Sequence, residues 1–155
     1  MTSHAGGISF IAFVVAVAVS LGYYQGVYIP QVNAKPILPE DVLNPESSFE
    51  ITIVEGASLE SNGRFFEPKD ARTTIGIDSR VIWKNADTVP HTVTTDDGYV
   101  DAINGEFNSL ANEEEPFVMP GSEFTFTFTK VGDYPYHCEP HPFMQGKIEV
   151  IENFA

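Results

Sequence analysis

The feature that most constrains the fold is a run of six residues, 124–129, in which phenylalanine and threonine alternate without exception. Successive side chains of an extended strand point to opposite faces, so the run places its aromatic rings on one face and its hydroxyls on the other. The run therefore predicts a half-buried β-strand whose aromatic face lies against a hydrophobic core.

Short strand-like runs recur along the chain and are separated by turn residues such as Met119-Pro120-Gly121. They are residues 49–54, 73–77, 80–84, 91–95, 134–138 and 147–151. About seven short strands at this spacing indicate an all-β fold, an antiparallel sandwich or barrel. After residue 30 no periodic apolar pattern predicts a long helix.

A possible metal-binding loop follows the predicted strand 134–138, where Cys138, His141 and Met144 stand at successive three-residue steps. Cys138 is the only cysteine, so no intrachain disulfide competes for its thiol. Thiolate, imidazole and a weak thioether are the ligands of trigonal copper sites with a long axial methionine. A buried, inert thiol beside a surface histidine is the simpler reading, but three ligand types at one spacing favour copper.

Such a site needs a second imidazole, and His91 is the candidate. The predicted strand 80–84 ends, the chain turns, and it restarts at His91 on a strand edge. His137 directly precedes Cys138, so strand alternation turns it to the opposite face, and we interpret it as a residue that does not bind metal. The predicted metal ligands are His91, Cys138, His141 and Met144.

The charge balance bears on possible partners. Eight basic and 22 acidic residues give a formal net charge of −14, which argues against nucleic acid, because binding to phosphates relies on lysine and arginine. An acidic surface can instead steer a basic protein partner. The acidic runs 96–97 and 113–115 are the first candidates, although each can equally be a solvated face that aids solubility.

The N-terminal residues 1–28 contain a nearly uninterrupted apolar stretch, residues 8–24, without a charge. Seventeen residues are at the lower limit for a transmembrane helix, and Tyr23, Tyr24 and Tyr28 suit the membrane interface. The alternative is a secretory signal peptide cleaved near Ala16-Val17-Ala18. We favour an uncleaved anchor, and both readings place the rest of the chain across a membrane.

Residues 29–48 contain four prolines and few large apolar side chains, a composition typical of a semi-rigid, extended linker. The predicted organisation is therefore an anchor or signal at 1–28, a proline-rich linker at 29–48 and a β-sheet domain at 49–155. The linker would allow that domain to stand off the membrane and reach a partner.

Several short motifs of the β-sheet domain occur together in one known family. They are Phe66-Glu67-Pro68, Trp83-Lys84-Asn85, Pro90-His91, Phe107-Asn108-Ser109, Pro120-Gly121 and the segment 136–144. With them the chain resembles the cupredoxins, the type 1 or blue copper proteins, and most closely the small amicyanin and plastocyanin-like members. The resemblance covers about residues 65–150, so the anchor and the linker lie outside it.

The resemblance implies an eight-stranded Greek-key β-sandwich that holds one copper ion, which cycles between Cu(I) and Cu(II). Residue by residue, it implies His91, Cys138 and His141 as equatorial ligands and Met144 as the axial one. One position departs from the family pattern: the residue after the first ligand histidine is often an asparagine that braces the cysteine loop, and here it is Thr92. Its hydroxyl can still form a hydrogen bond.

The function that the resemblance implies is transfer of one electron between redox protein partners, here at the outer face of a membrane. Pro140 and Pro142 restrict the loop around His141, so it should reorganise little when copper changes oxidation state. With Phe143 they form an apolar patch that we interpret as the exit for electrons and the docking place of the partner. The alternative is that Phe143 packs locally against the end of the barrel.

Two other functions remain open from the sequence. The first is a small copper redox enzyme, in which an open axial side lets a molecule such as nitric oxide or nitrite reach the metal. The second is a copper-handling module without turnover, which the low number of methionines, three in the chain, disfavours. An electron carrier, which is not an enzyme, is the favoured interpretation.

Overall fold

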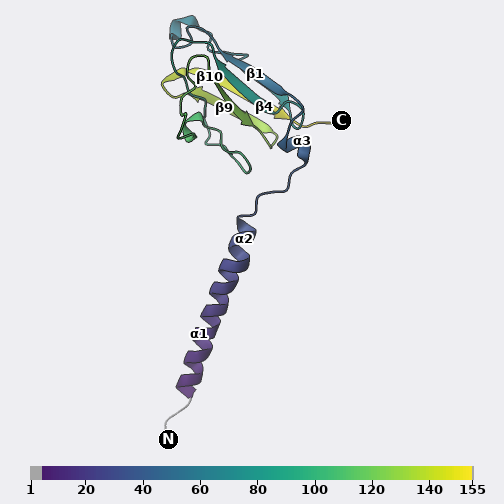
Figure 1. The fold of residues 1–155 in the computed structure, drawn as a ribbon, viewed down its shortest axis with the longest axis vertical. Coiled ribbons are helices and arrows are strands. Elements are labelled where there is room, and N and C mark those ends of the chain that lie inside the picture. Colours follow the sequence, from purple (N-terminus) through teal and green to yellow (C-terminus); the bar gives the residue numbers. More distant parts are fainter. Residues whose placement is uncertain (1–4, 155) are drawn as a thin grey trace. The chain divides into compact units, whose positions relative to one another are not determined.

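The structure is a computed structural model that describes residues 5–154, with side chains described from residue 10 onward. It divides into two units, Met1–Pro36 and Ile37–Ala155 (Figure 1). The first four residues of the predicted segment 1–28 and the last residue of the predicted domain 49–155 lie outside the described part of the chain.

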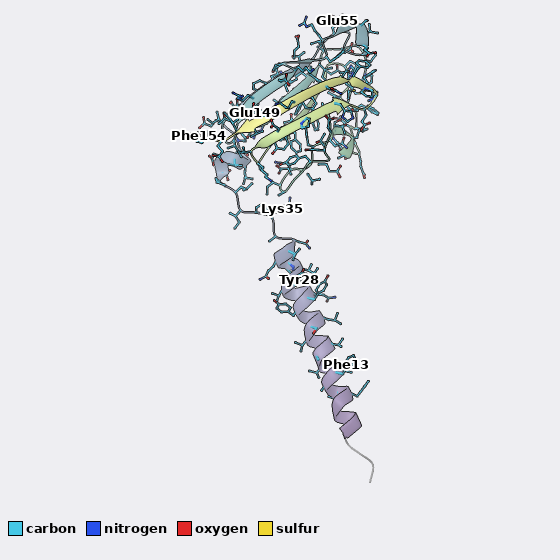
Figure 2. All side chains as sticks on the ribbon, turned by 180° about the vertical axis from the view of Figure 1, so that it is seen from behind. Phe13, Tyr28, Lys35, Glu55, Glu149 and Phe154 are labelled. Carbon is cyan, nitrogen blue, oxygen red and sulfur yellow. The ribbon has the colours of Figure 1, made fainter. Side chains whose placement is uncertain are left out.

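The N-terminal unit is one continuous helix built from three consecutive elements. They are α1 (Ala5–Tyr23), the π-helical segment η1 (Tyr24–Tyr28) and α2 (Ile29–Val32). Its stretch Phe10–Val32 has 23 residues, which at about 1.5 Å per residue gives about 34 Å, enough for a hydrocarbon layer of about 30 Å. Its side chains are exposed within the unit, as Phe13 illustrates (Figure 2). By length and composition this helix is able to cross a membrane.

The segment 29–48 is not extended throughout, contrary to the prediction. The helix continues past residue 28 to Val32, and α3 (Glu40–Leu43) adds one further helical turn. Pro30 is accommodated because it lies in the first turn of α2, directly after the π-helical segment, where the hydrogen-bond ladder is already shifted. The limits assigned to the linker stay predictions.

The second unit is a β-sandwich of two four-stranded sheets (Figure 1). The first sheet has the order β2 (Phe66–Glu67), β1 (Ser48–Ile53), β4 (Arg80–Asn85) and β8 (Glu123–Thr127). The second has the order β3 (Asp70–Thr74), β10 (His141–Ile151), β9 (Gly132–Cys138) and β5 (Thr94–Thr95). A two-stranded ribbon, β6 (Val100–Asp101) with β7 (Gly105–Glu106), and the 3-10 turns η2 (Glu60–Asn62) and η3 (Ser109–Ala111) complete the unit.

The all-β sandwich is confirmed, but its pairing is not purely antiparallel. β1 runs parallel to β4, and β10 runs parallel to β3. The reason is the path of the chain, which leaves the first sheet after β2, forms β3 in the second sheet, and returns to place β4 beside β1. Strands paired after such a crossover can run in the same direction, whereas hairpin neighbours cannot.

Two predicted strands differ from the structure. The predicted strand 73–77 occurs three residues earlier, as β3 (Asp70–Thr74), and of the predicted strand 91–95 only β5 (Thr94–Thr95) forms. Pro90 precedes His91 and has no N–H to donate, and the backbone of His91 pairs instead with Val118 in an isolated bridge. His91 therefore leaves the regular sheet.

The core between the two sheets is aromatic. Trp83 of β4 belongs to this core and is fully buried. Its ring centroid is 5.5 Å from that of Tyr136 on the facing sheet and 5.4 Å from that of Phe107. Phe126 and Phe128, from the alternating run, are also buried, so the aromatic face of that run does point into the core. These rings fill the space between the two sheets.

Candidate metal centre

The loop that carries Cys138, His141 and Met144 is a tight connection between β9 and β10. Cys138 is the last residue of β9, His141 is the first of β10, and the two are paired directly across the strands. The register then shifts between His141 and Gln145. The chain thus re-enters the sheet at His141, earlier than the predicted strand 147–151. A bulge between His141 and Gln145 accompanies the burial of Met144.

The loop that carries His91 follows β4 and is fixed by the side chain of Asn85. Its amide donates to the backbone oxygens of Val89 and Val118, at 2.9 and 2.8 Å, and its carbonyl oxygen accepts from the backbone N–H of Asp87. The backbone of His91 then exchanges two hydrogen bonds with Val118. Asn85 therefore ties both sides of this loop together and sets the position of His91.

These two segments bring three of the predicted ligands together. His91, Cys138 and His141 each present one ligand atom, and the three atoms lie within 4.8 Å of one another. The Sγ atom of Cys138 is 3.6 Å from Nδ1 of His91 and 3.7 Å from Nδ1 of His141. With metal bonds of about 2.3 Å to sulfur and 2.0 Å to nitrogen, ligands about 120° apart are separated by about 3.7 Å. The spacing therefore fits a trigonal metal site.

The cluster is closed to solvent on most sides. His91, Cys138 and Met144 are fully buried, while His141 is partly exposed. The ring centroids of His91 and His141 are 5.1 Å apart. Among the predicted ligands, His141 is thus the one through which the centre meets the surface.

Thr92 braces the cysteine loop, as its hydroxyl allowed us to expect. Its Oγ1 atom accepts a hydrogen bond of 2.8 Å from the backbone N–H of Glu139, and its own N–H donates to Sγ of Cys138 at 3.4 Å. This N–H points at the sulfur atom that the cluster offers as a ligand. The single hydroxyl of Thr92 ties the His91 segment to the Cys138 segment.

Asp87 is a residue of this centre that sequence reasoning missed. Its carboxylate is buried and its Oδ2 atom lies 2.9 Å from Nε2 of His91. Burial alone would raise the pKa of Asp87, but hydrogen bonds from His91 and from the backbone of Thr88, Gly56 and Ser58 outweigh it and hold the pKa well below its usual value. Burial lowers the pKa of His91, although the contact with Asp87 acts in the opposite direction. The lowered pKa favours the neutral imidazole, which is the form that binds metals. The only sign of this contact in the sequence is that Asp87 lies four residues before His91.

His137 points away from the cluster. Its Nδ1 atom lies 2.5 Å from a carboxylate oxygen of Asp96, and its Nε2 atom lies 3.5 Å from one of Glu139. His137 is partly exposed, whereas Cys138, the next residue, is fully buried, as expected for neighbours on a strand. This side chain belongs to the acidic surface rather than to the metal centre.

The apolar residues of the ligand loop fall into two groups. Pro140 and Pro142 are exposed on either side of His141. Phe143 is half-buried, with its ring centroid 5.2 Å from that of Phe65 and 5.8 Å from that of His141. The ring of Phe143 thus packs locally on the side that faces Phe65, as the alternative interpretation proposed. The exposed apolar surface around His141 is made mainly by the two prolines.

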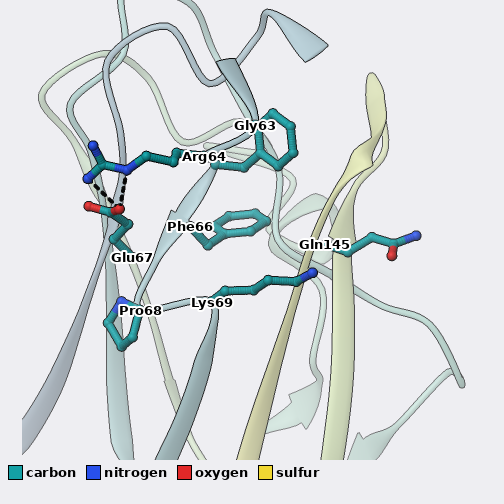
Figure 3. Close-up of a pocket in the computed structure, with 8 residues that line it drawn as sticks. Gly63, Arg64, Phe66, Glu67, Pro68, Lys69 and Gln145 are labelled. Atoms are coloured by element: carbon teal, nitrogen blue, oxygen red, sulfur yellow. Dashed lines mark hydrogen bonds and ion pairs between the residues drawn. The ribbon is translucent and has the colours of Figure 1, made fainter. Parts of the chain in front are cut away.

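A surface pocket of about 280 Å³ lies near β2, lined by the segment 63–69 and by Gln145 (Figure 3). Arg64 and Glu67 form an ion pair at this pocket. None of the predicted ligands lines it.

Comparison with known proteins agrees with the fold and the donor set. The sandwich and its thiolate and imidazole cluster define a cupredoxin. Residues 55–151 match the family described as copper binding proteins, plastocyanin/azurin family, and the chain belongs to this family. Copper, the predicted cofactor, is the metal of the family.

Three relatives illustrate the extent of the similarity. Amicyanin of Paracoccus denitrificans is 36% identical over 85 residues, which are 55% of this chain and 57% of that protein. Chloroplastic plastocyanin of Tetradesmus obliquus is 34% identical over 94 residues, 59% of this chain and 61% of that protein. The structure of a purple cupredoxin from Nitrosopumilus maritimus matches with a TM-score of 0.52 and 25% identity, covering 66% of this chain and 99% of that one. The matches thus span less than two thirds of the length of these two curated relatives, the amicyanin and the chloroplastic plastocyanin.

Proposed function

We propose that the protein is a type 1 copper electron-transfer protein, in which His91, Cys138, His141 and Met144 would hold the copper ion. The observation that carries this proposal is the trigonal cluster, with Cys138 Sγ at 3.6 and 3.7 Å from the two imidazole nitrogens. Copper would supply a one-electron couple, Cu(I)/Cu(II). The chain holds its donors in one arrangement through the Thr92 brace and the paired strand ends.

The burial of the cluster favours an electron carrier over an enzyme. A small molecule such as nitric oxide or nitrite would need an open coordination position, whereas His91, Cys138 and Met144 are all fully buried. An electron needs no such opening, because it can leave through the partly exposed ring of His141. The copper-handling alternative has no observation in its favour.

The proposed partners are redox proteins that dock around His141. The two exposed prolines beside it offer apolar contact, which marks many partner sites. A basic partner fits the formal charge of −14 and the exposed acidic residues Asp96 and Asp97. The acidic run 113–115 is exposed as well and would add to this attraction.

We further propose that residues 1–28 anchor the protein in the cell membrane as a single span, with the copper domain on the extracytoplasmic side. The helix Phe10–Val32 supports this by its length and apolar composition. If the segment is cleaved as a signal, the domain is secreted or periplasmic. In both cases the metal centre works outside the cytoplasm, where a soluble or membrane-bound partner can reach it.

The redox function is tested by stopped-flow mixing of the oxidised, copper-loaded protein with a reduced basic cytochrome. We expect the copper to be reduced and then reoxidised by an acceptor, with rates that fall as salt rises, because salt screens the attraction between opposite charges. A small neutral reductant serves as control and should show much weaker salt dependence. A copper ion that stays in one oxidation state would overturn the proposal. Spectral shifts on adding azide or nitrite would favour the enzyme instead.

The anchor is tested by two lysines placed near the centre of the helix, Val17→Lys and Leu21→Lys. Each charge at the middle of a span costs about 3 kcal/mol, so the variant should move from the membrane pellet to the soluble fraction. Val100→Lys, at an exposed position of β6, is the matched control and should leave the protein in the pellet. N-terminal sequencing of the purified protein identifies a cleaved signal, since the mature chain would then begin near Val19.

A further inference from the structure

The carboxylate of Asp87 is surrounded by hydrogen-bond donors. Its Oδ1 atom accepts from the backbone N–H groups of Gly56, at 3.0 Å, and Thr88, at 2.7 Å. Its Oδ2 atom accepts from the N–H of Ser58 at 3.1 Å and contacts Nε2 of His91 at 2.9 Å. Only 4% of Asp87 is exposed. The site therefore suits an anion, because an oxygen in either position faces two hydrogen-bonding groups of the protein.

This arrangement determines which nitrogen of His91 carries the proton. An ionised carboxylate only accepts hydrogen bonds, so Nε2 of His91 must donate to Oδ2. In the neutral ring the other nitrogen, Nδ1, then carries no proton and presents its lone pair 3.6 Å from Sγ of Cys138. That is the nitrogen which the cluster needs as a metal ligand.

We propose that Asp87 is a positioning residue of the copper centre, which holds His91 in the Nε2–H tautomer and lowers the reduction potential by placing a buried negative charge behind that ligand. The inference rests on the proposed function, because it takes His91 as a ligand. Asp87 acts through His91 and does not itself touch the metal.

The effect on the potential follows from the charge. Asp87 is in contact with the imidazole that faces the site, and a negative charge at this place stabilises Cu(II) more than Cu(I). Little water screens it, since both side chains are buried. Removal of the charge should therefore make the copper easier to reduce.

The test is the variant Asp87→Asn, compared with Asp101→Asn. Asp101 is a matched control, because it is also a buried carboxylate that accepts several hydrogen bonds. Its partners are Tyr99, Ile103, Asn104 and Thr129, none of them a predicted ligand. We expect the ratio of Cu(I) to Cu(II) at a fixed potential to rise at least tenfold in Asp87→Asn, a shift of about 59 mV for one electron. In Asp101→Asn it should stay unchanged.

A second readout uses the metal-free protein. Nitrogen NMR of the His91 ring should show a single Nε2–H tautomer in the wild type and in Asp101→Asn, and a mixture in Asp87→Asn. Asp87→Glu retains the charge and should keep the potential close to that of the wild type. If Asp87→Asn does not fold, Asp87→Ser removes the charge without an amide among the donors and is measured instead.

The outcomes separate the inference from the function on which it rests. A wild-type protein that takes up copper normally, together with equal potentials or equal tautomers in the two asparagine variants, overturns the role of Asp87 alone. A wild-type protein without a copper-thiolate absorption band contradicts the proposed ligand set, and the role of Asp87 in it is then overturned too.

Discussion

Cys138→Ser is expected to abolish the intense visible absorption of the copper-loaded protein. The band requires a covalent bond between copper and thiolate, and a serine hydroxyl does not ionise at neutral pH to replace it. Loss of a residue that only supports a metal ligand typically lowers metal affinity roughly 10- to 100-fold. Cys138→Ser removes a ligand itself, so copper affinity should fall by more than that. Absorption and EPR spectra measured during copper titration give both quantities.

His137→Gln is the matched control for this substitution. It removes an imidazole from the neighbouring position of the same strand, but that imidazole contacts Asp96 and Glu139 rather than the cluster. We expect its colour and copper affinity to match those of the wild type, and circular dichroism to confirm that both variants are folded. A visible band that persists in Cys138→Ser, or that disappears in His137→Gln, would contradict the assigned ligands.

Gly146→Ala is expected to be the most destabilising single-methyl change in the sandwich. Gly146 is paired with Tyr136 across β10 and β9, and an added Cβ would lie 2.5 Å from the phenolic oxygen of that ring and 2.9 Å from its Cε1 atom. Tyr136 cannot move aside, because it is fully buried against Phe66 and Trp83, with ring centroids at 4.9 and 5.5 Å. Overpacking of this kind costs about 1–3 kcal/mol, and we expect the upper end, measured by urea unfolding of the metal-free protein.

Gly132→Ala is the matched control in the neighbouring strand. Its Cβ would lie 3.2 Å from the hydroxyl of Tyr134, at the far end of a side chain, so the cost should be well below that of Gly146→Ala. In a Tyr136→Leu background the cost of Gly146→Ala should largely disappear, as a double-mutant cycle would show. Equal destabilisation by the two alanines would argue against the proposed clash.

Because Tyr136 lies two residues before Cys138, we also expect Gly146→Ala to broaden the copper EPR signal.

The strand pattern was largely predictable, and its failures have specific causes. The alternating run 124–129 overlaps β8 (Glu123–Thr127) over four residues, because alternation is a property of the extended backbone itself. β6 and β7 were not predicted, since each has only two residues and therefore no period to detect. His91 was placed on a strand edge, yet Pro90 and the bridge to Val118 hold it outside the regular sheet.

The candidate site was predictable where its residues are close in sequence. Cys138, His141 and Met144 lie on one short connection, so their spacing alone indicated a common centre. Asp87 was not predictable, because an aspartate in a turn usually faces solvent. Its role depends on the backbone N–H groups of Gly56 and Ser58, about 30 residues earlier in the chain.

The sequence by itself determined the properties that depend on neighbouring residues: strand periodicity, an apolar N-terminal helix and a cysteine, histidine and methionine at ligand spacing. Only the tertiary structure decided that His91 lies 3.6 Å from Cys138, 47 positions away, that the bulge buries Met144 and that Asp87 faces the imidazole. The physical reason is that periodicity and spacing follow from local backbone geometry. Contacts between distant segments depend instead on how the two sheets cross and pack. No local pattern in the sequence indicates which distant residues will be in contact.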